Sequence, residues 1–375
     1  MDSFAVIIPC YNRLDTLKAL LSSLERAHYC QGVSLVFSID NSGSDLIVKF
    51  AEKYNWRFGK KTIIHHKEKI GLRKNIISCG DLTKDYDAVI ILEDDLLVSP
   101  SFFDYASAAY EFYKDNDIIA GISLYSYRMS ENLHEFNPLT YGYDTYFIQW
   151  TSSWGQLWTK RQWATFKEWY NKKGEDITAI PIPDFVKTWT HSWKKYNIAY
   201  LVDTNRFYVY PIESYTSVQP TLGTHVAEVK LNNDNIVPLC FGSKRNLIFQ
   251  PYNATIVYDC FFEVKSLNVE LDGETVTVDL NIYGNKTKDS ITQRYFVSSK
   301  RLSNTKVFRK WGITTIPFET NIINSNEGDD LFLYDSNNFL RVELTPSEKV
   351  AFRVKLTIKE RILYYMQRAI QLLRQ

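Results

Sequence analysis

Three adjacent carboxylates, Glu93-Asp94-Asp95, are the residues of this sequence whose types and spacing most clearly indicate chemistry. They directly follow an apolar run that ends at Leu92. Carboxylates in such a position repel one another, and burying them without a cation is costly. Mg²⁺ or Mn²⁺ neutralises such groups and is commonly held by one or two carboxylates together with substrate phosphates. A solvated acidic turn or a helix start is the alternative, so the place of the triplet in the fold matters.

The strands and helices expected around the triplet predict its place in the fold. Strand and helix signals alternate over the first 120 residues, which indicates a mostly parallel sheet covered by helices on both faces. Apolar or β-branched runs predict four strands, at residues 4–8, 33–39, 62–64 and 87–92. Ligands of such sheets bind at the carboxyl ends of the strands. Polar residues stand at three of these ends: Arg13 after the first strand, Asp40 after the second and the triplet after the fourth.

The rest of the chain changes in composition twice. Residues 141–225 are rich in Trp and Tyr, and from about residue 232 short β-branched runs alternate with Asp-Gly and Tyr-Gly-Asn turns. The last segment, about residues 355–374, has a helical apolar stripe with basic residues elsewhere on the helix. We therefore expect three parts: an α/β catalytic domain over 1–231, a small β-rich accessory domain over 232–350 and a basic amphipathic helix over 351–375.

Two motifs resemble those of known glycosyltransferases. Residues 89–105, with Glu-Asp-Asp-Leu after an apolar strand and then Phe-Phe-Asp-Tyr, are similar to the acidic-motif region of the N-acetylglucosaminyltransferase I family. Residues 7–13, Ile-Ile-Pro-Cys-Tyr-Asn-Arg, resemble the start of bacterial family-2-type glycosyltransferases. The resemblance covers roughly residues 4–226 and implies a GT-A fold, a Rossmann-like domain that binds a nucleotide sugar. The usual Asp-x-Asp motif is Glu-x-Asp here, a departure that the N-acetylglucosaminyltransferase I group shares.

The resemblance also implies roles for single residues. Asp95 would be the direct ligand of Mn²⁺ or Mg²⁺, Asp94 would contact the ribose or support the metal, and Glu93 would face the hydroxyls of the donor sugar. Asp40, in Ser-Ile-Asp-Asn, would accept a hydrogen bond from uracil, and Arg13 would help to anchor the nucleotide.

Three further residues are candidates for the donor site. Arg73 follows Gly71 before a predicted helix, where a phosphate could bind; a basic surface loop is the alternative. His225, in Gly-Thr-His, would be a late metal ligand by the same resemblance, and an ordinary loop residue otherwise. Trp154 lies where these enzymes place a loop over the donor sugar, whereas most of the neighbouring Trp residues are expected in the core.

An inverting transfer also needs a general base that removes the proton of the acceptor hydroxyl as its oxygen attacks the anomeric carbon. Our candidate is Asp184, because the resembling families carry an Asp before a Trp-containing helix in this role. A helix N-cap is the other explanation of Asp184. Asp144 and Glu213 are the competing candidates for the base.

The composition of the chain indicates which classes of binding partner to expect. With 44 basic and 43 acidic residues the net charge is +1, which gives no electrostatic case for nucleic acid. Five dispersed cysteines, an N-terminal segment unlike a signal peptide and the lack of a long apolar run favour a cytoplasmic protein. The basic C-terminal helix indicates contact with a membrane surface, such as the inner face of the cell membrane, or with a protein or a second copy.

The sequence thus predicts a metal-dependent, inverting glycosyltransferase that moves a sugar from a nucleotide-diphosphate donor, a UDP-sugar being favoured, to a glycan or lipid-linked glycan acceptor. By resemblance, we expect a role in bacterial surface polysaccharide synthesis. A sugar nucleotidyltransferase shares the layout but needs a Gly-rich loop after the first strand, and residues 9–13 contain no Gly. A non-catalytic glycan-binding protein on a GT-A scaffold is the other alternative, and it would not need the acidic triplet.

Overall fold

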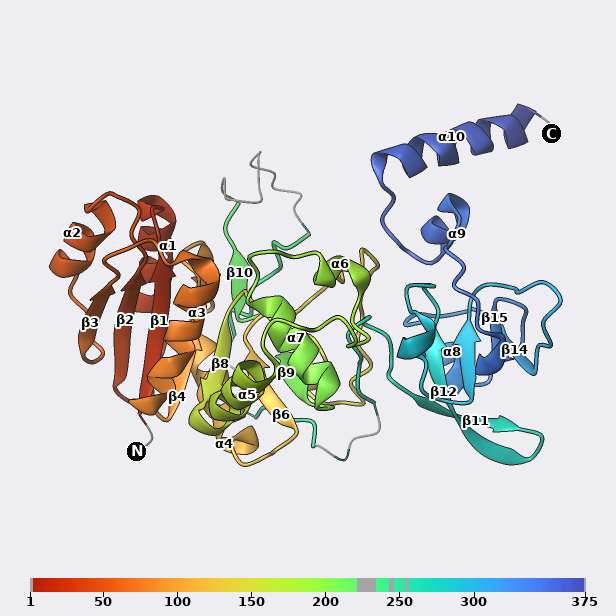
Figure 1. Ribbon diagram of the computed structural model, residues 1–375, viewed down its shortest axis with the longest axis horizontal. Coiled ribbons are helices and arrows are strands. Elements are labelled where there is room, and N and C mark those ends of the chain that lie inside the picture. The colour runs from red at the N-terminus through yellow and green to blue at the C-terminus, as the bar shows by residue number, and fades with distance from the viewer. Residues whose placement is uncertain (1–2, 221–233, 243–245, 252, 254–255, 374–375) are drawn as a thin grey trace. The chain divides into compact units, whose positions relative to one another are not determined.

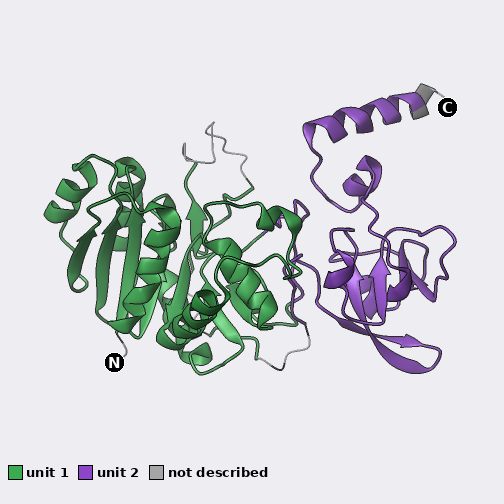
Figure 2. Cartoon of the chain, viewed as in Figure 1, with its two compact units in different colours: residues 1–127, 140–255 green, residues 128–139, 256–375 purple. Residues whose placement is uncertain are grey.

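The computed structural model describes residues 3–220, 234–242, 246–251, 253 and 256–373. The chain divides into two compact units (Figure 2): unit 1 comprises residues 1–127 and 140–255, and unit 2 comprises residues 128–139 and 256–375. The boundary expected between residues 231 and 232 lies outside the described residues. The three-part division of the sequence therefore stays a prediction.

An eight-stranded sheet in the order β3-β2-β1-β4-β8-β6-β9-β7 forms the centre of unit 1 (Figure 1). The first four strands of this order are parallel, and β8 runs antiparallel to both of its neighbours. Every residue of β1 is buried, as expected for a strand covered on both faces. The predicted α/β fold with a mostly parallel sheet is confirmed. The strands are β1 (Phe4–Cys10), β2 (Val33–Ile39), β3 (Lys61–His65), β4 (Ala88–Ile91), β6 (Ile119–Ser123), β7 (Thr145–Ile148), β8 (Gln156–Thr159) and β9 (Phe207–Pro211).

Helices follow the strands of unit 1 along the chain. Helix α1 (Leu14–Glu25) buries the side chains of Leu17, Leu20, Leu21 and Leu24. A short antiparallel pair joins β5 (Leu96–Val98) to β10 (Thr216–Val218). The helices are α1 (Leu14–Glu25), α2 (Leu46–Lys53), α3 (Gly71–Asp81), α4 (Phe102–Tyr113), α5 (Lys160–Lys173), α6 (Asp184–Lys187) and α7 (Lys194–Asp203), with a 3₁₀ turn η1 (Leu82–Lys84).

Unit 2 contains a five-stranded sheet in the order β11-β12-β13-β15-β14, which confirms the β-rich character of this part. Outside this sheet, Tyr258 forms an isolated bridge with Val264. The elements are β11 (Leu267–Leu271), β12 (Glu274–Asn281), η2 (Lys288–Ser290), β13 (Tyr295–Ser298), β14 (Arg309–Trp311), α8 (Glu319–Ile323), β15 (Leu331–Asp335), η3 (Ser336–Asn338), α9 (Pro346–Ala351) and α10 (Ile358–Leu373).

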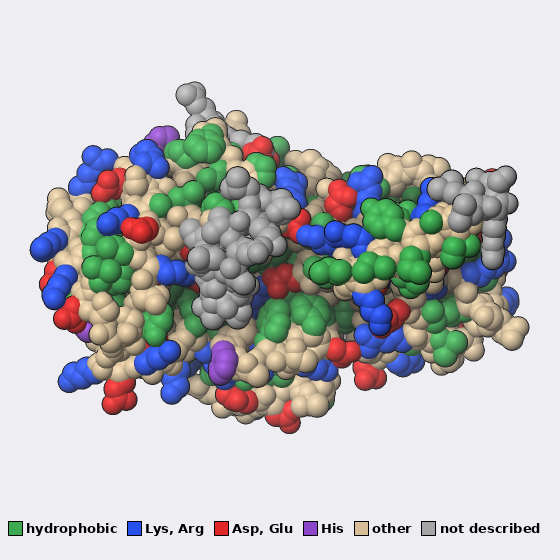
Figure 3. Space-filling model, turned by 90° about the horizontal axis from the view of Figure 1, so that it is seen from above, with side chains coloured by type: hydrophobic (Ala, Val, Ile, Leu, Met, Phe, Trp, Pro, Cys, Tyr) green, Lys and Arg blue, Asp and Glu red, His purple; other side chains and the backbone are tan. Residues whose placement is uncertain are grey.

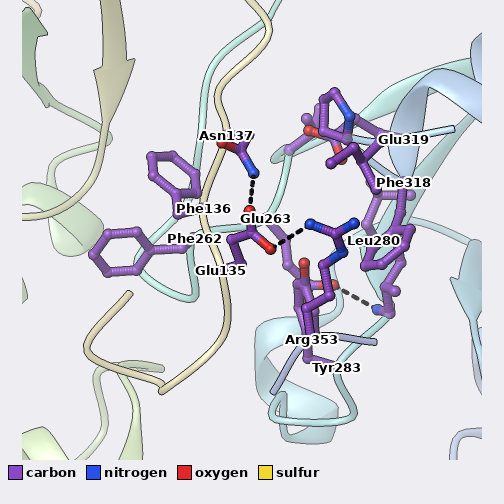
Figure 4. A pocket seen from close by; sticks show the side chains of 14 residues that line it. Glu135, Phe136, Asn137, Phe262, Glu263, Leu280, Tyr283, Phe318, Glu319 and Arg353 are labelled. Carbon is purple, nitrogen blue, oxygen red and sulfur yellow. Dashed lines mark hydrogen bonds and ion pairs between the residues drawn. The ribbon is translucent and has the colours of Figure 1, made fainter. Parts of the chain in front are cut away.

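Residues 128–139 leave unit 1 in sequence and build part of unit 2. Their fully buried His134 stacks on Tyr283 with 3.7 Å between the ring centroids. Nearby, the Glu135 carboxylate lies between the Asn137 amide and the Arg353 guanidinium (Figure 4). This segment lines a small pocket of unit 2 together with residues of the sheet and of α8 (Glu319–Ile323).

None of the helices in the described part of the chain has the length and hydropathy that a membrane-spanning helix needs.

Candidate active site

The acidic triplet follows β4 and meets Arg13, which follows the neighbouring strand β1. The Arg13 guanidinium donates to Asp95 Oδ2 at 2.6 Å and pairs with Asp94. The Asp94 side chain is only 2% exposed, whereas that of Asp95 is 20% exposed. Because parallel strands bring their carboxyl ends to one edge, two sequence-predicted positions that lie more than 80 residues apart form one charged cluster.

Burial controls the electrostatics of this cluster. It raises the pKa of Glu93 to about 8, with a further rise from the charge of Asp95. It also raises the pKa of Asp94 to about 6, against the opposing effect of Arg13. Desolvation disfavours the ionised carboxylate, and one guanidinium only partly compensates for it.

The donor atoms of the triplet fit a hard divalent cation, since they are carboxylate oxygens and Asp95 is partly open to solvent. Within the described residues, no group of three His, Cys, Asp or Glu side chains is arranged to hold a metal ion. The described residues therefore offer one or two carboxylates, a donor set that suits Mg²⁺ or Mn²⁺ shared with substrate phosphates. His225, the other predicted metal ligand, lies outside the described residues.

Asp40 lies at the end of β2 and is 5% exposed. Its carboxylate accepts hydrogen bonds from the backbone N–H groups of Ile70 at 2.8 Å and Gly71 at 2.9 Å, at the start of α3. Gly71 has φ = 80°, a conformation that glycine adopts without a Cβ penalty. Asp40 therefore holds the loop between β3 and α3 in place. Its predicted hydrogen bond from uracil would use the carboxylate lone pairs that do not accept from Ile70 or Gly71.

Arg73, in the first turn of α3, contacts a different part of unit 1. Its guanidinium donates to Glu175 Oε1 at 2.7 Å and to the carbonyl of Thr190, and it lies 4.9 Å from the ring centre of Tyr196. Arg73 thus connects α3 to the segments before and within α7. The predicted phosphate contact of Arg73 stays a prediction.

A buried lysine that sequence reasoning missed lies beside Trp154. The ammonium of Lys194, the first residue of α7, lies within 6.0 Å of the ring centres of Tyr127, Trp150, Trp154 and Trp189. Lys194 is 6% exposed, and its charge lowers the pKa of Glu93, against the larger effect of burial. Lys194 thus belongs to the electrostatic surroundings of the triplet, and Trp154, one ring of this aromatic cage, packs beside Lys194. The only sequence signal was the run of Trp residues, which core packing explains equally well.

Asp184 is exposed and is the first residue of α6, after Pro183 at the N-cap position. The helix N-cap is thus Pro183. The next residue, Phe185, packs against Trp189 with 5.7 Å and against Trp150 with 6.3 Å between ring centroids. Asp184 therefore directly precedes a residue that packs against two rings of the aromatic cage.

The competing candidates for the base lie elsewhere in unit 1. The Asp144 carboxylate accepts a hydrogen bond from the backbone N–H of Ile248 at 2.9 Å, which ties it to a loop. Glu213 accepts from the thiol of Cys240 at 3.5 Å.

A comparison with models of protein families matches the part of the chain that contains most of these residues. Residues 5–163 match the family model described as glycosyl transferase family 2. Over this range the chain is therefore similar to family-2 glycosyltransferases. The matched range includes Arg13, Asp40, Arg73, the triplet and Trp154, but it ends before Asp184 and His225.

Solved glycosyltransferase structures show weaker similarity to the chain. The S. aureus TarS fragment 1–349 in complex with UDP-GlcNAc is 16% identical, with a TM-score of 0.41 over 61% of this chain and 62% of that chain. Mannosyltransferase PcManGT from Pyrobaculum calidifontis, in complex with GDP-Man and Mn²⁺, is 14% identical, with a TM-score of 0.30 over 46% of this chain and 47% of that chain. The chain thus spans about three fifths of the TarS fragment. A search of the curated proteins gave no match.

Proposed function

We propose that this protein is a metal-dependent, inverting glycosyltransferase that transfers a sugar from a nucleotide-diphosphate donor, with a UDP-sugar favoured, to a glycan acceptor. The observation that carries the proposal is the cluster of Arg13 with Asp94 and Asp95 at the carboxyl edge of the sheet, in the part of the chain that is similar to family-2 glycosyltransferases. A glycan-binding protein would have no need of buried carboxylates at this edge.

Each predicted residue has a place in the proposed reaction. Asp40 and Arg13 bind the nucleotide, while Asp95, supported by Asp94 and by His225, holds Mn²⁺ or Mg²⁺. The metal, when bound, supplies positive charge that stabilises the leaving diphosphate. Glu93 orients the donor sugar through its hydroxyl groups, Trp154 covers the sugar, and Arg73 contributes positive charge near a phosphate.

Asp184 acts as the general base in this proposal. Its carboxylate takes the proton of the acceptor hydroxyl while the acceptor oxygen forms a bond to the anomeric carbon. The bond between that carbon and the diphosphate oxygen breaks in the same displacement, so the configuration inverts. A lipid-linked acceptor and a role in bacterial surface polysaccharide synthesis belong to the proposal as extensions from sequence resemblance.

Donor hydrolysis and thermal shift across a panel of nucleotide sugars, each with Mn²⁺ and with EDTA, test the proposal. We expect one donor to respond only with metal. Asp95→Asn should reduce metal-dependent turnover by about 10²–10³-fold, because a bound metal supplies several kcal/mol of charge stabilisation. Asp85→Asn, an exposed carboxylate before β4, is the matched control and should behave like wild type. A protein that binds glycan yet responds to no donor would support the non-catalytic alternative instead.

A further inference from the structure

Helix α10 presents an apolar face that the described part of unit 2 leaves exposed. Among residues 358–370, only Glu360 and Tyr364 are even partly buried. Six of the 18 exposed large hydrophobic side chains of the described chain lie on this one helix: Ile358, Ile362, Leu363, Tyr365, Met366 and Ile370. Packing of an apolar face supplies most of the stability of a helix in a protein, so this face calls for a covering surface.

The spacing of these residues makes the face continuous. Ile358, Ile362, Tyr365 and Met366 recur at intervals of three and four residues, which places them on one side of the helix. Arg361 and Arg368, seven residues apart, lie together along one flank of that side.

Charge identifies the chemistry of the covering surface. Residues 352–375 contain six basic side chains and one acidic one, a net charge of +5, whereas the whole chain has +1. The remaining residues therefore carry −4. The single acid, Glu360, already pairs with Lys349 Nζ at 2.6 Å and accepts from the Thr357 backbone N–H at 2.9 Å. The exposed helix surface is thus strongly basic, and the space-filling view shows hydrophobic side chains beside Lys and Arg near the C-terminal end of unit 2 (Figure 3).

We propose that α10 binds the surface of an anionic lipid bilayer, with its apolar face in the outer acyl region and Arg361 and Arg368 among the headgroups. A helix of this kind lies in the membrane interface, and 16 residues with this charge do not span a bilayer. A second copy of α10 would bring like charges together, and nucleic acid would leave the apolar side chains in water. An anionic bilayer surface contacts both the apolar face of α10, through its acyl chains, and the arginines on the flank, through its headgroups.

Co-sedimentation of the full chain with vesicles tests this proposal without any donor sugar, so its outcome is independent of the proposed transferase activity. The vesicles contain phosphatidylcholine alone, or phosphatidylcholine with an equal amount of phosphatidylglycerol. We expect binding to the anionic vesicles and weakening of that binding by salt. Arg361→Gln with Arg368→Gln should weaken it about 30-fold, because each basic side chain near an anionic surface contributes about fivefold.

Ile362→Ser with Met366→Ser tests the apolar face separately and should weaken binding by a similar factor. Lys172→Gln with Lys173→Gln, at the exposed end of α5, is the control for charge. Phe241→Ser with Ile248→Ser, both exposed in unit 1, is the control for hydrophobicity. Both controls should bind like wild type, and an unchanged far-UV spectrum shows that each variant is folded.

Three results would overturn the proposal. The wild-type chain could bind neither type of vesicle. The two α10 variants could bind as well as the controls. Light scattering could show a wild-type dimer that Ile362→Ser with Met366→Ser converts to a monomer, which would assign the apolar face to a second copy.

Discussion

Arg13 pairs with two of the three carboxylates of the acidic triplet. The guanidinium contacts both Asp94 and Asp95, so a donor diphosphate that binds Arg13 would compete with these carboxylates for it. A divalent cation would compensate the carboxylates at the same time. Donor and metal binding should therefore depend on each other, because either one alone leaves a charge without its partner.

Asp184→Asn tests the proposed general base. We expect turnover to fall by about 10²–10⁴-fold while donor affinity stays nearly unchanged, because the amide cannot take the proton but keeps the shape of the side chain. Initial rates and donor thermal shifts measure the two quantities. The matched variants are Asp144→Asn and Glu213→Gln. If one of these loses turnover and Asp184→Asn does not, the base is assigned to the wrong carboxylate.

Lys194→Met tests the buried cation in the aromatic cage. Methionine keeps an unbranched apolar stem among the rings but removes the ammonium, whose charge favours the ionised form of Glu93. We expect turnover to fall by about tenfold or more, since loss of one nearby charge is worth about 1.4 kcal/mol or more in a buried site. Lys195→Met, at the next position, should have little effect. Wild-type kinetics for Lys194→Met would show that this lysine serves packing alone.

At the scale of elements, Asp40 connects β2 to α3. Asp40→Ala removes the acceptor for the N–H groups of Ile70 and Gly71, as well as for that of Asn41. We expect the free energy of unfolding to fall by roughly 2 kcal/mol or more, because hydrogen bonds to charged groups are worth about 1.5–3 kcal/mol. Urea denaturation measures the change. Asp45→Ala, which removes only an exposed pair with Lys49, should cost less than about 1 kcal/mol.

The parallel half of the sheet was predictable, whereas its second half was not. The apolar runs at 4–8 and 88–92 are typical of strands buried on both faces, and they form β1 and β4. The antiparallel position of β8 between β4 and β6 depends on pairing between distant segments, which local pattern does not encode.

Contacts between segments that are distant in sequence also decide which candidate site residues could be predicted. Asp40 and the triplet stand directly after strands, so topology alone brings them to one edge. Lys194 enters the site only through the packing of four aromatic rings from three separate segments. Arg73 has a suitable position in the sequence, but a carboxylate about 100 residues away, Glu175, contacts it in the fold.

At the scale of the whole molecule, unit 2 is built from two separate stretches of the chain. The sequence analysis predicts no strand or helix over residues 128–139, yet His134 is fully buried there and pairs by an isolated bridge with Val354. The segment forms no regular helix or strand, and such a segment carries no periodic pattern by which it could be predicted. A domain boundary placed by composition alone therefore does not detect it.

In unit 2 the buried His134 and the half-buried Glu319 have opposite effects on the pH dependence of stability. Burial lowers the pKa of His134 from 6.5 to about 4, so between these values the unfolded chain binds the extra proton and stability rises with pH. Burial raises the pKa of Glu319 from 4.5 to about 7. The folded chain then binds the extra proton, so this contribution is present below pH 4.5 and is lost as pH rises to about 7.

Glu319→Gln should separate the two effects. The amide keeps an acceptor for the Tyr258 hydroxyl, which lies 3.1 Å from the native carboxylate, and it does not ionise. Relative to wild type, we expect the variant to gain roughly 1–3 kcal/mol of unfolding free energy between about pH 5 and pH 8. Urea denaturation at the two pH values measures this difference, and Glu327→Gln, an exposed acid of the same unit, should show none. If the variant and wild type keep the same difference at both pH values, Glu319 is ionised throughout, and its carboxylate is solvated in the folded protein.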